Sequence, residues 1–466
     1  MNIVNLRGRE LHREYKRRYQ VSKVTDYLNS RSDRVCVLYG LRRTGKTTII
    51  EHSIAELLDS GISESEILFI TCELNDTATM GDIYNLIDKS NTKYIFIDEI
   101  AYISDFIERA ALLYDIYSRG QNKRIVIAGT NLSSIFVSTL TTLFDRTLKI
   151  PVEHLTFYEH CKFVLETDKP EFSDFTHYLM HGGLYASDAQ YTEYVQSSII
   201  NHLDDTLHTA SAKQIYSWVS TSKFDKIGWG GVLNNIGLYS AGNMSNVNIT
   251  TRNSLNEDYR HVKAALSRDI DREVLSELSE YLGLGSILRG SMKKDEVIGL
   301  LDFLVSCGFL FILPNIVTGA KTGDRSKCYV TFPFIRFYYT VELFNLLGEE
   351  STWANSSLAG ILAEGCAVCE YHMAHRDEDV YFWRETVAGN VQECDLVVSD
   401  YMSLNWPLKE GKAYEFKLKH DGQYSGLYVL KNTHPEYGIL EYTKLEGEEL
   451  MKWVYDLGSL AYRNLG

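Results

Sequence analysis

The chain has 466 residues, of which 45% are hydrophobic, and it contains only six prolines. This composition excludes a disordered chain and supplies enough apolar residues for several packed cores, about three domains. The formal net charge of −15 means that a contact with nucleic acid would need a local basic patch, because the average surface repels phosphate.

The first residues and the cysteines bear on the cellular compartment. Residues 1–10 are polar and lack the apolar core of a secretory signal, and the eight cysteines have no regular spacing. A reducing cytoplasm is therefore expected. The longest apolar stretch, 297–313, carries Asp302 and is followed by Pro314, so we expect a buried helix and a strand at 309–313, and no membrane contact.

From Arg34 onward, short apolar segments alternate with amphipathic helical segments. This alternation predicts an α/β fold with a parallel sheet covered on both faces. The expected strands are 35–39, 67–72, 94–97, 124–128 and 147–152, the last of which closes the sheet. The basic segment 7–18 precedes them. It is more typical of a solvated helix face than of phosphate binding, and it stays unassigned.

After Pro151 the pattern becomes mostly helical. Segment 271–313 has the order helix, helix and hairpin, which suits a winged helix-turn-helix, a module that binds DNA or protein. A further αβ region runs from about residue 353 to the end. Its expected strands are 380–383, 394–398, 413–417 and 437–442.

The segment 40–47, Gly-Leu-Arg-Arg-Thr-Gly-Lys-Thr, follows the first apolar strand and precedes a helix expected at 46–58. A triphosphate carries about four negative charges, which inward-facing backbone N–H groups of a Gly-containing loop can meet. Lys46 would contact the β and γ phosphates, and the Thr47 hydroxyl would ligate Mg²⁺. The motif therefore predicts binding of a nucleotide with Mg²⁺. The expected nucleotide contacts are Gly40, Leu41, Arg42, Arg43, Thr44, Gly45, Lys46, Thr47 and Thr48.

The apolar run 94–97 delivers Asp98 and Glu99 to the carboxyl edge of the sheet, where ligands bind. Asp98 would hold the Mg²⁺ through water, and Glu99 would be the general base that orients the attacking water. The alternative is an acidic pair that caps the following helix.

The strand at 124–128 is followed by Gly129, Thr130 and Asn131. Thr130 or Asn131 would serve as the sensor between the carboxylates and the γ-phosphate, and a helix N-cap is an equally good interpretation. A guanine-specific motif, Asn-Lys-x-Asp after a strand, is missing from the sequence, so ATP is the expected nucleotide.

These motifs resemble the AAA-type ATPases of bacteria and archaea that carry a C-terminal domain of restriction-endonuclease-like fold. That family has a Gly-x-Arg-x-x-Gly-Lys-Thr loop and a strand ending in Asp-Glu, and both are present here. It also has a Gly-Arg pair and a Pro-Leu-Ser-Phe-x-Glu-Phe segment. Here these read Asp145-Arg146 and, at 155–160, Leu-Thr-Phe-Tyr-Glu-His, so the arginine and the Phe-x-Glu core match while the glycine and the last phenylalanine do not.

The resemblance implies four parts. These are an AAA-type P-loop ATPase domain at 1–152, a helical lid at 153–205, a winged-helix-containing linker domain at 206–345, and a restriction-endonuclease-like α/β domain at 346–466. Arg146 becomes the best candidate for the arginine finger, acting in cis or from a neighbouring subunit, and Arg109 and Arg119 are competing candidates. A structural salt bridge is an equally good interpretation of Arg146.

Metal-dependent nucleases of this class need carboxylates that hold Mg²⁺ and a nearby lysine that orients the attacking water. Glu364 on a helix, Asp395 on a strand, and Glu415 with Lys417 on a later strand supply these groups. The period of two places Glu415 and Lys417 on one face and directs Phe416 into the core. An active nuclease, a binding module without cleavage and a plain scaffold all remain open.

Cys366, Cys369, His372 and His375 recur every three residues and invite a zinc interpretation. On a helix, each step of three turns the side chain by about 300°, so the four side chains fan out and do not converge on one ion. We expect packed cysteines and partly exposed histidines instead.

Three functions are compatible with these features. The first is an Mg²⁺-dependent ATPase that moves the winged-helix region and the C-terminal domain, and the second is a nuclease controlled by that ATPase. The third is a nucleotide-controlled interaction switch with little turnover. The expected partners are ATP and either DNA, a second protein or further copies of the chain.

Overall fold

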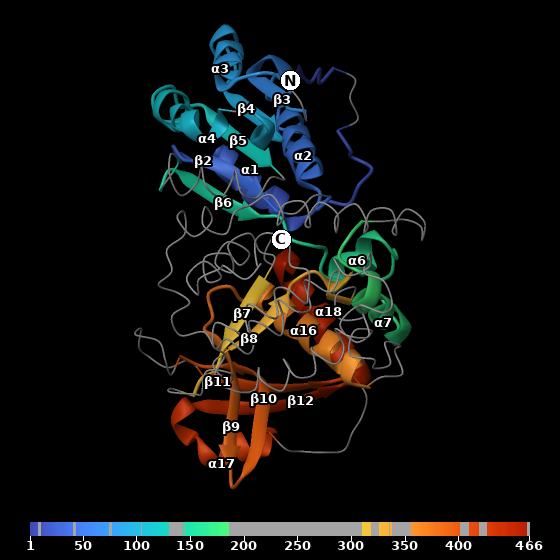
Figure 1. The fold of residues 1–466 in the computed structure, drawn as a ribbon. Coiled ribbons are helices and arrows are strands. Elements are labelled where there is room, and N and C mark those ends of the chain that lie inside the picture. Colours follow the sequence, from blue (N-terminus) through green and yellow to red (C-terminus); the bar gives the residue numbers. More distant parts are fainter. Residues whose placement is uncertain are drawn as a thin grey trace, which may run out of the picture. The chain divides into compact units, whose positions relative to one another are not determined.

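A computed structural model of the protein describes two compact units, one ending at His154 and one beginning at Leu155 (Figure 1). The described residues are 1–7, 11–40, 43–73, 77–103, 105–129, 143, 145–185, 310–317, 326–334, 336–337, 356–400, 410–418 and 426–463.

The first unit contains a six-stranded sheet of order β1-β3-β4-β5-β2-β6. Its strands are β1 (Asn2–Ile3), β2 (Val35–Tyr39), β3 (Ile67–Thr71), β4 (Tyr94–Asp98), β5 (Arg124–Gly129) and β6 (Thr147–Pro151). β1 is antiparallel to β3, and the other five strands are parallel. The five strands expected from the sequence are confirmed, with every end within one residue of its expected place, and β6 closes the edge beside β2.

Consecutive residues of the buried strands pack on opposite faces of this sheet. Leu38 and Phe96 belong to the apolar cluster of α1 (Tyr19–Asn29) and α2 (Lys46–Asp59). Val37 and Ile97 belong to the cluster of α3 (Met80–Lys89) and α4 (Phe106–Arg109). Side chains alternate along a strand, so burying both faces requires the continuous apolar runs seen in the sequence. Short helical segments η1 (Glu64–Glu66), η2 (Ile100–Tyr102) and η3 (Leu113–Ser118) complete the unit.

The second unit contains a four-stranded sheet of order β12-β11-β10-β9. Its strands are β9 (Val380–Val387), β10 (Asn390–Val398), β11 (Gly411–Lys417) and β12 (Ile439–Glu446). β9, β10 and β11 are antiparallel neighbours, whereas β11 and β12 are parallel. All four strands expected in this region are present, and most are longer than expected. They form a mixed α/β unit.

Helices cover both faces of the second sheet. One apolar cluster joins the sheet to α16 (Ser356–Ala374), α18 (Gly447–Arg463), α6 (Phe157–Phe163) and α7 (Phe172–His181). The opposite cluster joins it to α17 (Gly426–Thr433) and η8 (Pro435–Tyr437). An antiparallel pair, β7 (Leu310–Pro314) and β8 (Ser326–Val330), also contributes to the first cluster.

The Phe-x-Glu segment, 157–159, contacts several helices of the second unit. Thr156 and Glu159 form a reciprocal cap at the start of α6. The Phe157 backbone N–H and the Tyr178 hydroxyl both donate to Glu370 Oε1 of α16, at 2.9 and 2.7 Å. Burial raises the pKa of Glu370 to about 8. The resemblance pointed to the Phe-x-Glu motif but gave it no role. The structure shows that the motif connects α6 and α7 to α16.

Several sequence expectations concern α16 and its surroundings. Cys366 and Cys369 are buried in the apolar core, and His372 stacks on Phe311 with ring centroids 4.1 Å apart. His375 stacks on the ring of Tyr371 instead of converging with the cysteines. The packing interpretation of this helix is thus confirmed. Of the described helices, none is long and apolar enough to cross a membrane.

The linker region is described only in part. The strand expected at 309–313 is confirmed as β7 (Leu310–Pro314). The expected winged-helix helices before it, and the domain boundaries at 205/206 and 345/346, lie outside the described residues. The division into four parts therefore stays a prediction.

Candidate functional site

The phosphate loop connects β2 to α2 and depends on its two glycines. A Cβ on Gly40 would lie 2.2 Å from the carbonyl oxygen of Val152, so a larger side chain does not fit beside the chain leaving β6. Gly45 has a φ of +89°, in the left-handed region, and forms the N-cap of α2. The loop thus turns sharply into the positive end of a 14-residue helix, which is the geometry of an anion site.

The reactive side chains of the two motifs converge at this loop. The Thr47 hydroxyl donates to Asp98 Oδ2 at 2.6 Å, and the Lys46 ammonium donates to the carbonyl of Gly40 at 3.0 Å. Burial raises the pKa of Asp98, which the hydrogen bond from Thr47 opposes. The Glu99 backbone N–H donates to Asp98 Oδ1 at 3.0 Å. A hydroxyl and a carboxylate in contact offer the hard oxygen ligands that Mg²⁺ requires, so these residues fit a nucleotide with its metal.

Arg18 supports the loop from outside the motif. Its guanidinium donates to the carbonyl of Thr44 in the loop at 3.0 Å, to that of Glu153 at 3.0 Å, and to that of His154 at 3.2 Å. The side chain is only 7% exposed. Arg18 therefore ties the phosphate loop to the chain that follows β6. The sequence showed the basic character of 7–18 but had no signal for the burial of one of its arginines.

The candidate arginine finger takes part in surface contacts. Arg146 Nη1 lies 3.0 Å from Asp115 Oδ2, and its guanidinium lies over the Tyr114 ring, 5.3 Å from the centroid. The structure therefore shows the salt bridge that was the alternative interpretation of Arg146. Its role as an arginine finger stays a prediction. The competing Arg109 pairs with Asp105 at 3.4 Å within one helical turn.

The remaining predicted nucleotide contacts differ in exposure. Arg43 is exposed, Thr44 is buried and Thr48 is half-buried. β5 lies between β4 and β2, so its end at Gly129 reaches the edge between Asp98 and the loop. The predicted contacts outside the described residues are Leu41, Arg42, Thr130 and Asn131.

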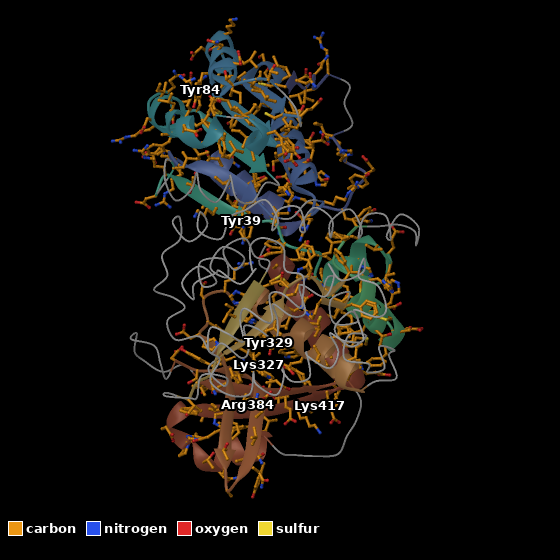
Figure 2. All side chains as sticks on the ribbon, in the orientation of Figure 1. Tyr39, Tyr84, Lys327, Tyr329, Arg384 and Lys417 are labelled. Atoms are coloured by element: carbon orange, nitrogen blue, oxygen red, sulfur yellow. The ribbon has the colours of Figure 1, made fainter. Side chains whose placement is uncertain are left out.

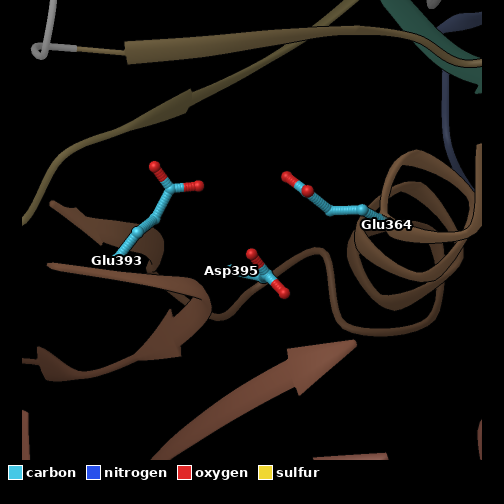
Figure 3. A group of neighbouring side chains, drawn as sticks. All are labelled: Glu364, Glu393 and Asp395. Carbon is cyan, nitrogen blue, oxygen red and sulfur yellow. The ribbon is translucent and has the colours of Figure 1, made fainter. Parts of the chain in front are cut away.

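A second group of functional side chains lies in the second unit. Glu364 of α16 and Glu393 and Asp395 of β10 each offer one carboxylate oxygen, and these oxygens lie within 4.8 Å of one another. Figure 3 shows the three carboxylates approaching a common space from the helix and from the strand. We call them the carboxylate cluster. Glu364 and Asp395 were predicted to meet, and the structure brings them together.

A β-bulge in β10 lies directly beside the cluster. From Cys394 to Val397, β10 advances three residues while β9 advances two. Cys394 and Val397 pack on the α17 side, whereas Leu396 packs on the α16 side. The extra residue therefore leaves Asp395 and Leu396 together on the face that α16 covers. Bulges of this kind commonly redirect side chains beside functional sites.

Lys327 of β8 lies at the centre of the cluster. Its ammonium is 2.7 Å from Glu364 Oε1, 2.5 Å from Glu393 Oε1 and 3.8 Å from Asp395 Oδ1. The Tyr329 hydroxyl donates to the same Glu364 oxygen at 2.7 Å. Figure 2 labels Lys327 and Tyr329 together on this strand. Three elements of the unit thus contribute to one charged group.

Burial and nearby charges have opposite effects on the pKa values of Glu364 and Lys327. Burial and the charge of Glu364 raise the pKa of Asp395 to about 7. Burial would also raise the pKa of Glu364, but Lys327, the Tyr329 hydroxyl and the charge of Lys417 together outweigh it, and the pKa of Glu364 falls below its ordinary value. Burial disfavours the ammonium of Lys327, yet the carboxylates raise its pKa well above the ordinary range. Lys327 is therefore charged at neutral pH.

Glu415 and Lys417 were predicted to complete the metal site. Lys417 Nζ lies 3.4 Å from Glu415 Oε1, and Glu415 is only 4% exposed. Ala413 packs on the α17 side and Phe416 on the α16 side, as the sequence predicted for Phe416. The charge of Lys417 acts to lower the pKa of both Glu364 and Asp395, so Lys417 lies within electrostatic range of the cluster. The carboxylate that converges with Glu364 and Asp395 is that of Glu393 and not that of Glu415.

Sequence reasoning missed three members of this group. Glu393 precedes Asp395 by two residues, so the period of two was a usable signal. Lys327 and Tyr329 come from a different predicted domain, and no local pattern connects them to α16 or β10. Only the packing of β8 against α16 shows that they belong together.

Comparisons with known proteins agree with the first site. Residues 32–161 match the family described as an AAA domain. This part of the chain is therefore an AAA-type P-loop domain. No curated protein matches the chain significantly.

Solved structures give distant likenesses. The Walker-type ATPase PABY2304 of Pyrococcus abyssi is 12% identical, over 72% of this chain and 99% of that one, with a TM-score of 0.36. The ORC1 protein of Aeropyrum pernix in complex with DNA is 10% identical, over 73% and 93%, with a TM-score of 0.26. The Hsp104–ADP complex of S. cerevisiae is 14% identical, over 78% and 44%, with a TM-score of 0.23. With TM-scores this low, these likenesses carry no further conclusion.

Proposed function

We propose that the chain is an Mg²⁺-dependent ATPase. The observation that carries this proposal is the 2.6 Å hydrogen bond from Thr47 to Asp98, which joins the phosphate loop to the strand-end carboxylate. An AAA-type P-loop domain needs both groups at one edge of its sheet. A bound Mg²⁺ would neutralise phosphate charge, with Thr47 and Asp98 as the residues that hold it.

The side chains around this pair have distinct tasks in the proposal. The ammonium of Lys46 balances charge on the β and γ phosphates, and the backbone N–H groups of the loop orient them. Glu99 accepts the proton of the attacking water. Thr130 or Asn131 would position that water, and Arg146 would stabilise the transition state after leaving Asp115, in cis or in a neighbouring subunit.

The test is Glu99→Gln, which removes the base and keeps the shape. The variant should bind ATP as the parent does and hydrolyse it at least about 100-fold more slowly, because general bases contribute rate factors of this order. Turnover is measured by phosphate release, and binding by calorimetry. Glu108→Gln, an exposed glutamate of α4, is the matched control and should keep the parental rate. Hydrolysis by Glu99→Gln at the parental rate would remove Glu99 from the role of base.

A nucleotide-controlled switch is the alternative, and the same proteins distinguish it. A switch predicts that the parent itself retains ATP or ADP tightly and turns over very slowly. Mass spectrometry of nucleotide and nucleic acid that copurify with Glu99→Gln identifies the retained nucleotide. It also reports whether DNA is a partner of the linker region 206–345. In either case we place the protein in the cytoplasm.

For residues 346–466 we propose a restriction-endonuclease-like domain whose movement follows the nucleotide state. The convergence of Glu364 and Asp395 supports this proposal. Nuclease activity would use these carboxylates to hold Mg²⁺, with Glu415 and Lys417 as the further residues implied by the resemblance. The carboxylate cluster is the one observation that favours this second function.

A further inference from the structure

The cation already present in the carboxylate cluster is an amino group of the protein. The ammonium of Lys327 makes contacts of 2.7 Å with Glu364 and 2.5 Å with Glu393, which are hydrogen-bond lengths for a charged pair. Its 3.8 Å distance to Asp395 Oδ1 leaves that oxygen without a close contact to the ammonium. Lys327 thus bridges two of the three carboxylates, and Arg384 Nε adds a second cation 3.5 Å from Glu393 Oε2.

We infer that Lys327 occupies the position of a divalent cation in this cluster, and that the β7–β8 pair thereby keeps the cluster closed to metal. A second consequence is that Glu393, and not Glu415, is the third carboxylate ligand of the cluster once it is open. This inference concerns cation binding and holds whether or not the cluster cleaves nucleic acid.

Space and charge make the two cations mutually exclusive. The three oxygens lie within 4.8 Å of one another, which leaves room for one small cation at their centre. Mg²⁺ needs oxygen ligands at about 2.0–2.1 Å, and an ammonium needs them at about 2.7–2.9 Å. Two positive centres in that space would repel each other strongly, because the group is buried and little water screens it. Either Lys327 or a metal ion can be present.

The position of Lys327 depends on how the β7–β8 pair is held. Leu313 of β7 is buried in the core with α16, and Asn315 continues from β7 to pair with β9. The Asn315 side chain donates to the carbonyl of Arg384 at 2.9 Å, and the Ile316 N–H donates to that of Phe382 at 2.9 Å. Movement of this pair would withdraw the Lys327 ammonium and the Tyr329 hydroxyl from Glu364 together.

The test measures Mn²⁺ binding by the nucleotide-free full-length chain, using calorimetry and the electron paramagnetic resonance of free Mn²⁺. Lys327→Met should bind one Mn²⁺ per chain more than the parent, with an affinity at least tenfold above any the parent shows. The added site should disappear in Lys327→Met combined with Asp395→Asn. Lys162→Met is the matched control, because this lysine of the same unit pairs with Asp168 outside the cluster. It should behave as the parent does.

Two results would overturn the inference. One is a folded Lys327→Met protein, by circular dichroism, that binds no more Mn²⁺ than the parent. The other is a parent that already binds Mn²⁺ at a site lost on Asp395→Asn. If the methionine variant does not fold, Lys327→Gln replaces it, because its amide can still donate to one carboxylate while removing the charge.

Cleavage assays on the same proteins keep the nuclease proposal separate. Mn²⁺ binding by Lys327→Met without cleavage of any DNA or RNA supports the inference and removes the nuclease proposal. Cleavage that appears only in Lys327→Met supports both. Cleavage by the parent that is lost on Asp395→Asn supports the nuclease proposal and overturns closure by Lys327.

Discussion

Arg18 stabilises the phosphate loop through three backbone carbonyls, one in the loop and two after β6. A guanidinium offers five donors in a planar fork, so one side chain can serve all three acceptors. Because the group is buried, these carbonyls have little access to replacement water. The loop geometry therefore depends not only on the motif glycines but also on a residue 22 positions before the first of them.

Removing Arg18 should weaken both stability and nucleotide binding. Arg18→Ala leaves buried carbonyls without donors, so we expect a loss of about 3 kcal/mol in the free energy of unfolding and a roughly tenfold weaker affinity for ATP. Urea denaturation and calorimetry measure the two effects. Arg18→Lys should recover only part of each, because an ammonium cannot reach all three oxygens at once.

Arg13→Ala is the control for this experiment. Arg13 pairs with Asp59 at 2.9 Å on the surface, and both side chains are at least half exposed. Surface pairs contribute about 0–1 kcal/mol, so the change in stability should be small. Equal effects of the two alanine substitutions would show that Arg18 does not position the loop.

Among the elements, α18 and α6 are packed so closely that a glycine is required between them. A Cβ on Gly458 of α18 would lie 2.7 Å from Tyr158 Cβ and 2.9 Å from Thr156 Oγ1 of the α6 cap. Small residues let helices approach each other, although glycine lowers helix propensity. This contact holds α6 against α18, the last described helix of the chain.

Substitution of two helical glycines tests this packing. Gly458→Ala should lower the free energy of unfolding by about 1–3 kcal/mol, because the backbone of α6 cannot give way without loss of contacts. Gly360→Ala in α16 has no atom within 4 Å of the new Cβ and should be neutral or stabilising by up to about 1 kcal/mol. Chemical denaturation measures both variants. A Gly458→Ala protein as stable as Gly360→Ala would contradict the close packing.

At the level of the whole molecule, two units with separate apolar cores are expected to unfold separately. Only the first contains the phosphate loop, so ATP with Mg²⁺ should raise the transition temperature of one of two calorimetric transitions. At a nucleotide concentration 100-fold above Kd, the stabilisation is about 2.7 kcal/mol. Lys46→Ala should abolish the shift and leave the second transition in place. One transition that shifts as a whole would show that the units unfold together.

Local patterns in the sequence determined the parallel strands of the first unit. The strands β2 to β5 contain continuous apolar runs, and such runs are typical of strands that are buried on both faces. The phosphate loop and Asp98 follow two of these strands directly, so the sheet edge brings them together. That is why Thr47 and Asp98 could be expected at one site from the sequence alone.

Only the tertiary structure decided the composition of the carboxylate cluster. The bulge between Cys394 and Val397 is a matter of strand register, and amino-acid patterns do not show it. Lys327 reaches Glu364 across 37 positions of sequence, through the packing of β8 against α16. Contacts of this kind depend on how separate elements pack and not on the propensity of any one of them. The sequence thus determined where the phosphate loop and its acidic partner lie, and the fold decided which charged side chains meet in the second unit.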